Sequence, residues 1–303
     1  MEVRKTNLSI FNFKMKKLIK RGVLFLIITG IVSLILGLLS VVVSKKTFDY
    51  KIKEKKNILI VGNSHTECSV NDSIISNSLN LSQSASSYFY SYMKIRVFTK
   101  YNPQIDTVII SFSDNDLFSE KEEWFSSSQK INNKMKRHII LFNKDDYLDL
   151  FKSNPFEVSF QTFILYSEFY SLYTQKRDFI GGYNKLNVNK IDEAIIEFNL
   201  SPSIVDEEIA MTELKYLLKI YDFTQENNIQ LILLNTPIHP ILEKHFAVIK
   251  PRNLQIVLEK MPNATYFDHT SFMLENSMYA DLRHLNNQGS NKYSEFLQSI
   301  FNK

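Results

Sequence analysis

Apolar positions along this chain fall into one long uninterrupted run and several short runs. The long run, from Gly22 to Ser44, holds 23 residues without a charged side chain. As a helix it would extend about 34 Å, enough to cross a hydrocarbon core of about 30 Å. A cleaved signal peptide has a shorter apolar region that ends in a small-x-small site. The run therefore predicts an uncleaved membrane anchor.

Basic residues flank this run on both sides. Residues 1–56 carry thirteen Lys or Arg and three Asp or Glu, whereas residues 57–303 carry 23 basic and 29 acidic side chains. The net charge of +4 therefore belongs to the anchor segment. Residues 57–303 carry a net negative charge, so their overall charge does not favour binding to nucleic acid. We expect a basic cytoplasmic tail at 1–21, the anchor at 22–44, a basic linker at 45–56 and an extracytoplasmic domain at 57–303.

The shorter apolar runs alternate with segments of helical periodicity. The runs that predict buried strands are Asn57–Val61, Thr107–Phe112, Gln230–Leu234 and Thr265–Phe267. The segments that predict helices are Asp72–Leu79, Ser86–Tyr101, Ile209–Asn227, Asn253–Met261 and Asn287–Phe301. This alternation indicates an α/β fold, a three-layer parallel sheet with helices on both faces.

Residues 117–208 interrupt this alternation and predict a helical insertion. The segment is rich in aromatic residues, namely Phe156, Phe160, Phe163, Tyr166, Phe169, Tyr170 and Tyr173. These side chains could form an insertion core that packs on the sheet. They could instead form a lid, or a surface for a membrane partner.

Two short motifs carry candidate chemistry. Ser64 lies in a Gly-Asn-Ser-His segment directly after the first predicted strand, and Asp281 precedes His284 by three residues near the C-terminus. Active sites of parallel α/β sheets form outside the carboxyl ends of the strands. A serine hydroxyl becomes nucleophilic when a base takes its proton and a third group holds that base in the right tautomer. The motifs therefore predict acyl transfer through a serine.

Four sequence blocks in this order resemble those of the SGNH (GDSL-like) hydrolase superfamily, over residues 57 to 303. The blocks are Gly62-Asn63-Ser64, Asn80 to Ala85, Ser113-Asp114-Asn115-Asp116, and Asp281 with His284. The first block has Asn where most members have Asp. The second and third blocks lack the usual glycine. The resemblance implies the flavodoxin-like fold of that superfamily.

The resemblance also implies roles for these residues. Ser64 would be the nucleophile, His284 the base and Asp281 the group that orients it. The oxyanion hole would be formed by the backbone N–H of Ser64, the Asn115 amide and a backbone N–H of Ser82 or Ala85. His65 and His239 are possible residues of the site rim, and each has a plain structural role as its alternative.

No metal or cofactor is expected. The sequence has no His/Cys cluster with zinc-ligand spacing and no glycine-rich phosphate loop. The single cysteine, Cys68, cannot form an intrachain disulfide.

The layout of a basic tail, one span and then the domain is similar to that of the DltD-like and polysaccharide O-acetyltransferase branches. This implies a serine acyltransferase that moves an acyl group, most often acetyl, onto a cell-surface glycan, with a multi-span membrane acyltransferase as partner. A carbohydrate esterase of the same fold and a non-catalytic assembly subunit are the alternatives. Whether water or a sugar hydroxyl resolves the acyl-enzyme depends on water exclusion, which the sequence does not reveal.

Overall fold

A computed structural model of the chain describes residues 2–52, 55–168, 173–174, 176–200, 208–247 and 252–301. Its centre is one sheet of five parallel strands in the order β2-β1-β3-β4-β5, which is the flavodoxin-like order of doubly wound sheets. The strands are β1 (Ile58–Val61), β2 (Ser78–Asn80), β3 (Thr107–Ser111), β4 (Gln230–Asn235) and β5 (Thr265–Asp268). The α/β class and the four predicted strands are confirmed.

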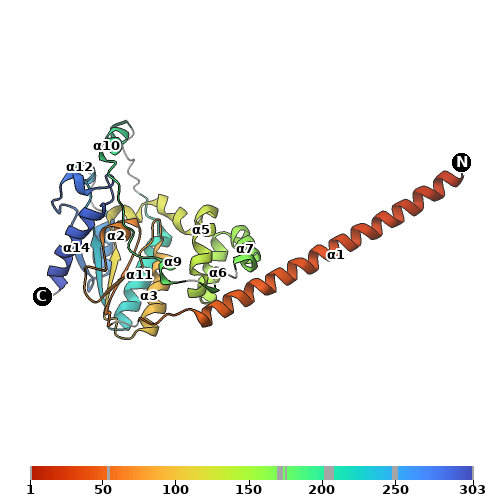
Figure 1. Ribbon diagram of the computed structural model, residues 1–303, viewed down its shortest axis with the longest axis horizontal. Helices are drawn as coiled ribbons and strands as arrows, with labels where there is room; N and C mark the ends of the chain where they lie inside the picture. The colour runs from red at the N-terminus through yellow and green to blue at the C-terminus, as the bar shows by residue number, and fades with distance from the viewer. Residues whose placement is uncertain are drawn as a thin grey trace.

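Helices cover both faces of the sheet (Figure 1). Alternate strand side chains point to opposite faces, so Leu59 and Val108 enter one apolar cluster and Ile60 and Ile109 enter the other. The first cluster is closed by α3 (Tyr88–Tyr101), α11 (Met211–Glu226) and α13 (Arg252–Lys260). The second is closed by α12 (Pro240–Ala247) and α14 (Asn287–Phe301), and α14 also contacts α2 (Ser64–Ser69). The predicted helices at α3, α11, α13 and α14 are confirmed.

The prediction of a helix over Asp72–Leu79 is wrong. This segment forms turns that lead into β2, an edge strand that pairs in parallel with β1. Side chains hold the turns, because Asn71 accepts a hydrogen bond from the Ser73 N–H and Asp72 accepts one from the Asn80 N–H. Asn77 has a φ of 62°, in the left-handed region, which no right-handed helix accommodates.

The insertion is helical in the part of 117–208 that the structure describes. It contains α4 (Glu122–Ser126), α5 (Ser128–His138), α6 (Lys144–Ser153), α7 (Pro155–Ile164), α9 (Arg177–Ile180) and α10 (Ile191–Leu200), with the 3-10 turns η3 (Ile139–Leu141) and η4 (Leu165–Glu168). Phe156, Phe160 and Phe163 are exposed, so the interpretation of these residues as an insertion core is wrong. Phe169 and Tyr170 lie outside the described residues.

The N-terminal helix α1 runs from Glu2 to Thr47 and extends away from the domain (Figure 1). Its part from Met15 to Thr47 has a mean hydropathy of 2.8 over its most apolar window, so it is long and apolar enough to cross a membrane. This helix contacts the insertion through α7, η3 and η4, and its contacts include Gly30 beside Phe163 and Ser40 beside Leu165. The apolar run predicted as an anchor therefore forms part of one continuous helix that packs against the insertion from Gly30 onward.

Candidate active site

Ser64 begins a helix immediately after a sharp turn at the carboxyl end of β1. Gly62 has a φ of 149°, and a Cβ atom there would lie 2.4 Å from the Cβ of Ser111 on the neighbouring strand, so only glycine fits. Asn63 then caps α2, because its side-chain oxygen accepts the N–H of His65 at 2.9 Å. This turn places the Ser64 side chain at the carboxyl edge of the sheet.

His284 joins Ser64 to Asp281. Its Nε2 lies 2.8 Å from the Ser64 Oγ, and its Nδ1 lies 2.9 Å and 3.1 Å from the two carboxylate oxygens of Asp281. An ionised carboxylate only accepts hydrogen bonds, so Nδ1 carries the proton and Nε2 presents its lone pair to the serine hydroxyl. Ser64, 220 residues from His284 in the sequence, thus joins the Asp281–His284 pair in one chain of hydrogen bonds.

Asp281 is held ionised and in a fixed orientation. Its Oδ1 accepts the backbone N–H groups of Arg283 and His284 at 2.7 and 2.9 Å. Burial alone would raise the pKa of Asp281, but the hydrogen bonds from His284 and from these two backbone groups outweigh burial and lower the pKa below its usual value. The His284 ring is therefore oriented by a carboxylate that its own loop locks in place.

The loop after His284 is fixed by the start of the last helix. Asn286, directly before α14, accepts the N–H groups of Gln288 and Gly289 at 3.0 and 3.2 Å. A Cβ atom on Gly289 would lie 2.2 Å from the Met278 carbonyl oxygen, so a larger residue would push this loop away. Both features hold His284 at its distance from Ser64.

His65 lies beside this chain of hydrogen bonds and remains neutral. Its ring centroid is 5.6 Å from that of His284. Burial, together with the nearby His284 and Arg283, lowers the pKa of His65 to about 3. His65 lines a cavity of about 400 Å³ together with Asn115 and Arg283. His65 is thus an uncharged residue in the wall of this cavity, and its role at a site rim stays a prediction.

Asn115 follows β3 in a short 3-10 turn, η1 (Asp114–Leu117), and is half-buried. Among the described residues, no hydrogen bond occupies its side-chain amide, so the amide is available to the cavity. Asp116, in the same turn, accepts Asn63 Nδ2 at 2.7 Å and the Ser113 N–H at 2.7 Å. This buried carboxylate joins the turn after β3 to the turn after β1, and the sequence reasoning gave it no role.

Ser82 does not supply a free donor. Its N–H donates to the side chain of Asn80 at 2.8 Å, and its hydroxyl accepts a hydrogen bond from Thr66. Ala85, the other predicted donor of this block, is half-buried and has a φ of 49°. An alanine in the left-handed region is uncommon, because glycine usually occupies such positions. Ala85 is therefore the residue of the block with a glycine-like backbone.

Two buried lysines donate hydrogen bonds to the Asn80–Ala85 loop. Lys134 of α5 donates to the Ser84 carbonyl at 2.5 Å and to Gln83 Oε1 at 2.8 Å, and Lys94 donates to the Leu81 carbonyl at 2.7 Å. Because the Ser84 carbonyl belongs to the peptide group whose N–H is that of Ala85, the Lys134 contact makes that N–H a stronger donor. Burial lowers the pKa of Lys134 to about 7. No local sequence signal connects Lys134 to a loop fifty residues away.

His239 is not a rim residue. It is 3% exposed, its Nε2 lies 3.1 Å from the Asn276 side-chain oxygen, and its ring packs against Tyr279. Its N–H donates to the Leu282 carbonyl at 3.0 Å, so it supports the loop that carries Asp281. The prediction for His239 is corrected to this structural role.

The walls around the site come from the sheet domain and from the insertion. Apolar side chains of Ile238, Leu242, Phe246 and Tyr266 line the 400 Å³ cavity next to His65 and Asn115. A second hollow of about 310 Å³ lies where α10 of the insertion meets Asp281 and His284. The insertion therefore contributes directly to the surroundings of the site.

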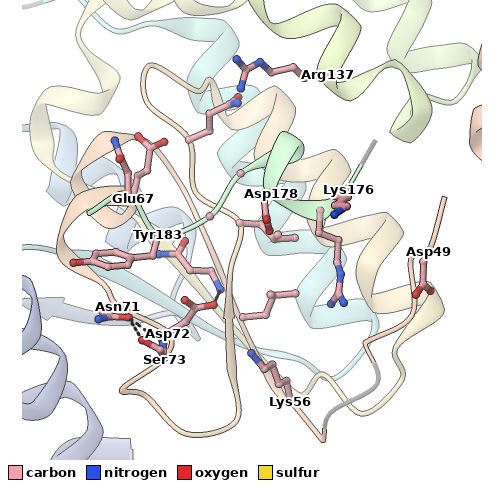
Figure 2. A pocket seen from close by; sticks show the side chains of 18 of the residues that line it. Asp49, Lys56, Glu67, Asn71, Asp72, Ser73, Arg137, Lys176, Asp178 and Tyr183 are labelled. Carbon is pink, nitrogen blue, oxygen red and sulfur yellow. Dashed lines mark hydrogen bonds between the residues drawn. The ribbon is translucent and has the colours of Figure 1, made fainter. Parts of the chain in front are cut away.

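A larger cavity of about 1,010 Å³ lies on the other side of α2, against β2. Figure 2 shows its lining, where Glu67 of α2 and Tyr183 lie near Asp72 and Asn71. Acidic and basic side chains alternate around it, including Asp178 and Lys176, so it has no preference for one sign of charge. Ser64 and His284 do not line it. Within the described part of the chain, no group of three or more His, Cys, Asp or Glu could hold a metal ion.

Comparisons with known proteins add little to this geometry. One protein-family model matches residues 184–303, a segment that includes Asp281 and His284 and excludes Ser64. This is less than half of the chain, so it does not assign the chain to a family. No curated protein matches the chain.

Proposed function

We propose that this protein is a membrane-anchored serine acyltransferase of the SGNH hydrolase type, which forms an acyl-enzyme on Ser64. The observation that carries the proposal is the 2.8 Å contact between Ser64 Oγ and His284 Nε2, with Asp281 on the other ring nitrogen. This arrangement is the one that activates a serine for attack on an ester carbonyl.

Each proton in the proposed reaction passes through His284. Ser64 Oγ attacks the carbonyl carbon of an acyl donor while His284 Nε2 takes the hydroxyl proton. The protonated His284 then gives this proton to the leaving alcohol, and the acyl group stays on Ser64. An acceptor hydroxyl attacks the acyl-enzyme in the same way, which regenerates the free serine. Asp281 stabilises the imidazolium without taking its proton.

The oxyanion of each tetrahedral intermediate needs donors near Ser64. The proposed donors are the Ser64 N–H, the Asn115 amide and the Ala85 N–H. The unoccupied amide of Asn115 and the Lys134 contact with the Ser84 carbonyl support these assignments. Each such donor contributes roughly 3 kcal/mol in comparable sites.

The fold and the order of the motifs support the SGNH assignment. Ser64 follows β1, the Asn80–Ala85 block follows β2, and Asn115 follows β3. These three strands are neighbours in the sheet, in the order β2-β1-β3. The left-handed backbone of Ala85 accounts for a block without its glycine, because this residue adopts the conformation for which glycine is usually required.

The anchor supports an acceptor in the cell envelope. Helix α1 is long enough to span the membrane and packs against the insertion, which would keep the domain at a membrane surface. We propose that the N-terminus is cytoplasmic and that the domain transfers an acetyl group to an envelope polysaccharide. A multi-span membrane acyltransferase would supply the acyl donor on the same side as Ser64.

Hydrolysis of the acyl-enzyme is the second candidate, and the solvent exposure of the site supports it. The side chains of His284 and Asp281 are 22% and 42% exposed, so water reaches the base. An esterase that removes acyl groups from the same polysaccharides would use the same residues. The two activities differ in the acceptor that attacks the acyl-enzyme.

A trapping experiment tests the proposal and separates the two candidates. The purified chain is incubated with p-nitrophenyl acetate and its intact mass is followed, for the wild type and for Ser64→Ala and His284→Ala. We expect an acetyl adduct on the wild type only. Addition of envelope oligosaccharides should then divert the acetyl group from water to sugar. A folded wild-type chain that neither gains the adduct nor releases p-nitrophenol faster than Ser64→Ala would contradict both candidates.

A further inference from the structure

Helix α7 buries three polar side chains together with Val158, and its three aromatic side chains point outward. Glu157, Gln161 and Thr162 are buried, whereas Phe156, Phe160 and Phe163 are 81%, 50% and 40% exposed. The three phenylalanines follow each other at four and three residues, so they share one face. A helix that covers a water-soluble core has the opposite pattern.

The buried polar groups of α7 are satisfied within the insertion. Gln161 Nε2 donates to Glu157 Oε1 at 2.8 Å, and the Thr162 hydroxyl donates to the Val158 carbonyl and contacts Tyr147. Asn154 caps the first turn by accepting the Glu157 N–H. The outward face of the helix therefore carries no unmet polar requirement apart from the hydroxyl of Ser159, which is exposed.

Helix α7 and the following η4 pack against the apolar helix α1. A Cβ on Gly30 would lie 3.8 Å from the Phe163 ring, and the Ser40 hydroxyl lies 3.5 Å from the Leu165 carbonyl oxygen. The covered face of α1 consists of small residues and one valine: Gly30, Ser33, Gly37, Ser40, Val41 and Ser44. Small residues let two backbones approach closely, as they do between helices in membranes.

These contacts lie deep in the apolar run. Gly30 is eight residues beyond Gly22, so at 1.5 Å per residue it lies about 12 Å from the charged N-terminal flank. From Gly30 to Ser44 the same rise gives about 21 Å. A hydrocarbon core of about 30 Å that begins near Gly22 therefore includes the part of α1 beside Phe163.

We propose that the outward face of α7 is embedded in the lipid leaflet on the domain's side of the membrane, with Phe156, Phe160 and Phe163 among the acyl chains. The inference rests on α1 spanning the membrane and is independent of the chemistry at Ser64. Lipid is the occupant that the structure favours, because lipid must surround α1 at the depth where α7 contacts it. The insertion then fixes the height and tilt of the domain instead of leaving it on a flexible tether.

Depth-dependent quenching of a single tryptophan tests this placement in the full-length chain. Trp124 is the only tryptophan, so the background is Trp124→Phe. Phe160→Trp and Phe156→Trp each add one reporter on α7, and Phe156 is so exposed that its replacement cannot disturb packing. The matched control is Met273→Trp, since Met273 is 88% exposed outside the insertion. Each purified variant is placed in phosphatidylcholine–phosphatidylglycerol vesicles whose acyl chains are brominated at a shallow, middle or deep carbon.

We expect both α7 reporters to be quenched about threefold more strongly than the Met273→Trp control, since a residue inside the hydrocarbon core meets the bromine atoms. Unfolding midpoints equal to that of the background would show that the variants are folded. These vesicles contain no other protein. Quenching of the α7 reporters no stronger than that of the control would overturn the proposal and assign this face to a protein partner.

Discussion

Replacing Asp281 with Asn tests the hydrogen-bond chain while keeping its shape. In the variant, the remaining side-chain oxygen can still accept the N–H groups of Arg283 and His284, which Oδ1 accepts now at 2.7 and 2.9 Å. The amide nitrogen then replaces Oδ2, which lies 2.9 Å from His284 Nδ1. Because that nitrogen donates, Nδ1 must accept, and the imidazole proton moves to Nε2.

With the proton on Nε2, His284 can no longer act as the base. With the proton on Nε2, the ring donates to the Ser64 hydroxyl at the 2.8 Å contact instead of taking its proton. Loss of the correct tautomer in a serine site of this kind lowers turnover by about 10,000-fold, or about 5 kcal/mol of transition-state stabilisation. We therefore expect Asp281→Asn to label with a fluorophosphonate at least about 1,000-fold more slowly than the wild type.

The assay compares labelling rate and p-nitrophenyl acetate turnover for the wild type, Asp281→Asn and an exposed control, Asp222→Asn on α11. The control makes the same carboxylate-to-amide change away from the site and should match the wild type. The unfolding midpoint of Asp281→Asn should stay near that of the wild type, since the backbone contacts of the loop survive. A folded Asp281→Asn chain that keeps a tenth of the wild-type labelling rate would refute the assigned role of Asp281.

Three further predictions concern the supports of the site. Asn63→Asp should lower the unfolding free energy, measured by urea denaturation, by roughly 2 to 4 kcal/mol, because a carboxylate would face the buried Asp116. Adding Asp116→Asn should restore most of this loss, and no recovery in the double variant would contradict the assignment. Lys134→Met should lower kcat about tenfold with little change in KM, because the Ser84 peptide loses its buried donor; an unchanged kcat would separate Lys134 from the oxyanion loop. Burial raises the pKa of Glu213 to about 8, so the stability that its neutral form contributes is complete below pH 4.5 and is lost as pH rises through 8. Glu213→Gln should therefore unfold at a higher temperature than the wild type at pH 9 and show no such advantage at pH 5.

Buried strands were predictable because each is a short apolar run that both faces of the sheet require. Strand β2 was missed, since Ser78–Asn80 has three residues and only Leu79 is apolar. In the segment before β2, the Asp72 side chain accepts a backbone N–H and Asn77 has a left-handed backbone. The spacing of apolar residues in the sequence does not distinguish such turns from a short helix. Ser78 and Asn80 are buried but polar, so this strand shows no apolar pattern in the sequence.

The residues of the candidate site were predictable as far as they follow strands directly. Ser64 and Asn115 follow β1 and β3, and the parallel arrangement brings both to one edge of the sheet. The choice between Ser82 and Ala85 needed the backbone angle of Ala85 and the Asn80 contact, which no composition reveals. The role of Lys134 could not be predicted from the sequence, because only the tertiary packing of α5 brings Lys134 to the Asn80–Ala85 loop.

The aromatic residues of the insertion show a second limit of prediction from apolar periodicity. Phe156, Phe160 and Phe163 have the helical spacing that usually marks a buried face. Periodicity identifies an apolar face but not the medium that covers it. In this chain the anchor supplies a second apolar environment, so the face can be turned outward.

Covalent labelling tests directly whether Ser64 is an activated nucleophile. The full-length chain is treated with a fluorophosphonate, digested, and the modified peptide is located by mass spectrometry. We expect one adduct, on Ser64, that disappears in Ser64→Ala and forms far more slowly in His284→Ala. A wild-type chain that is folded and remains unlabelled, or that is labelled on another serine, would contradict an activated nucleophile at Ser64.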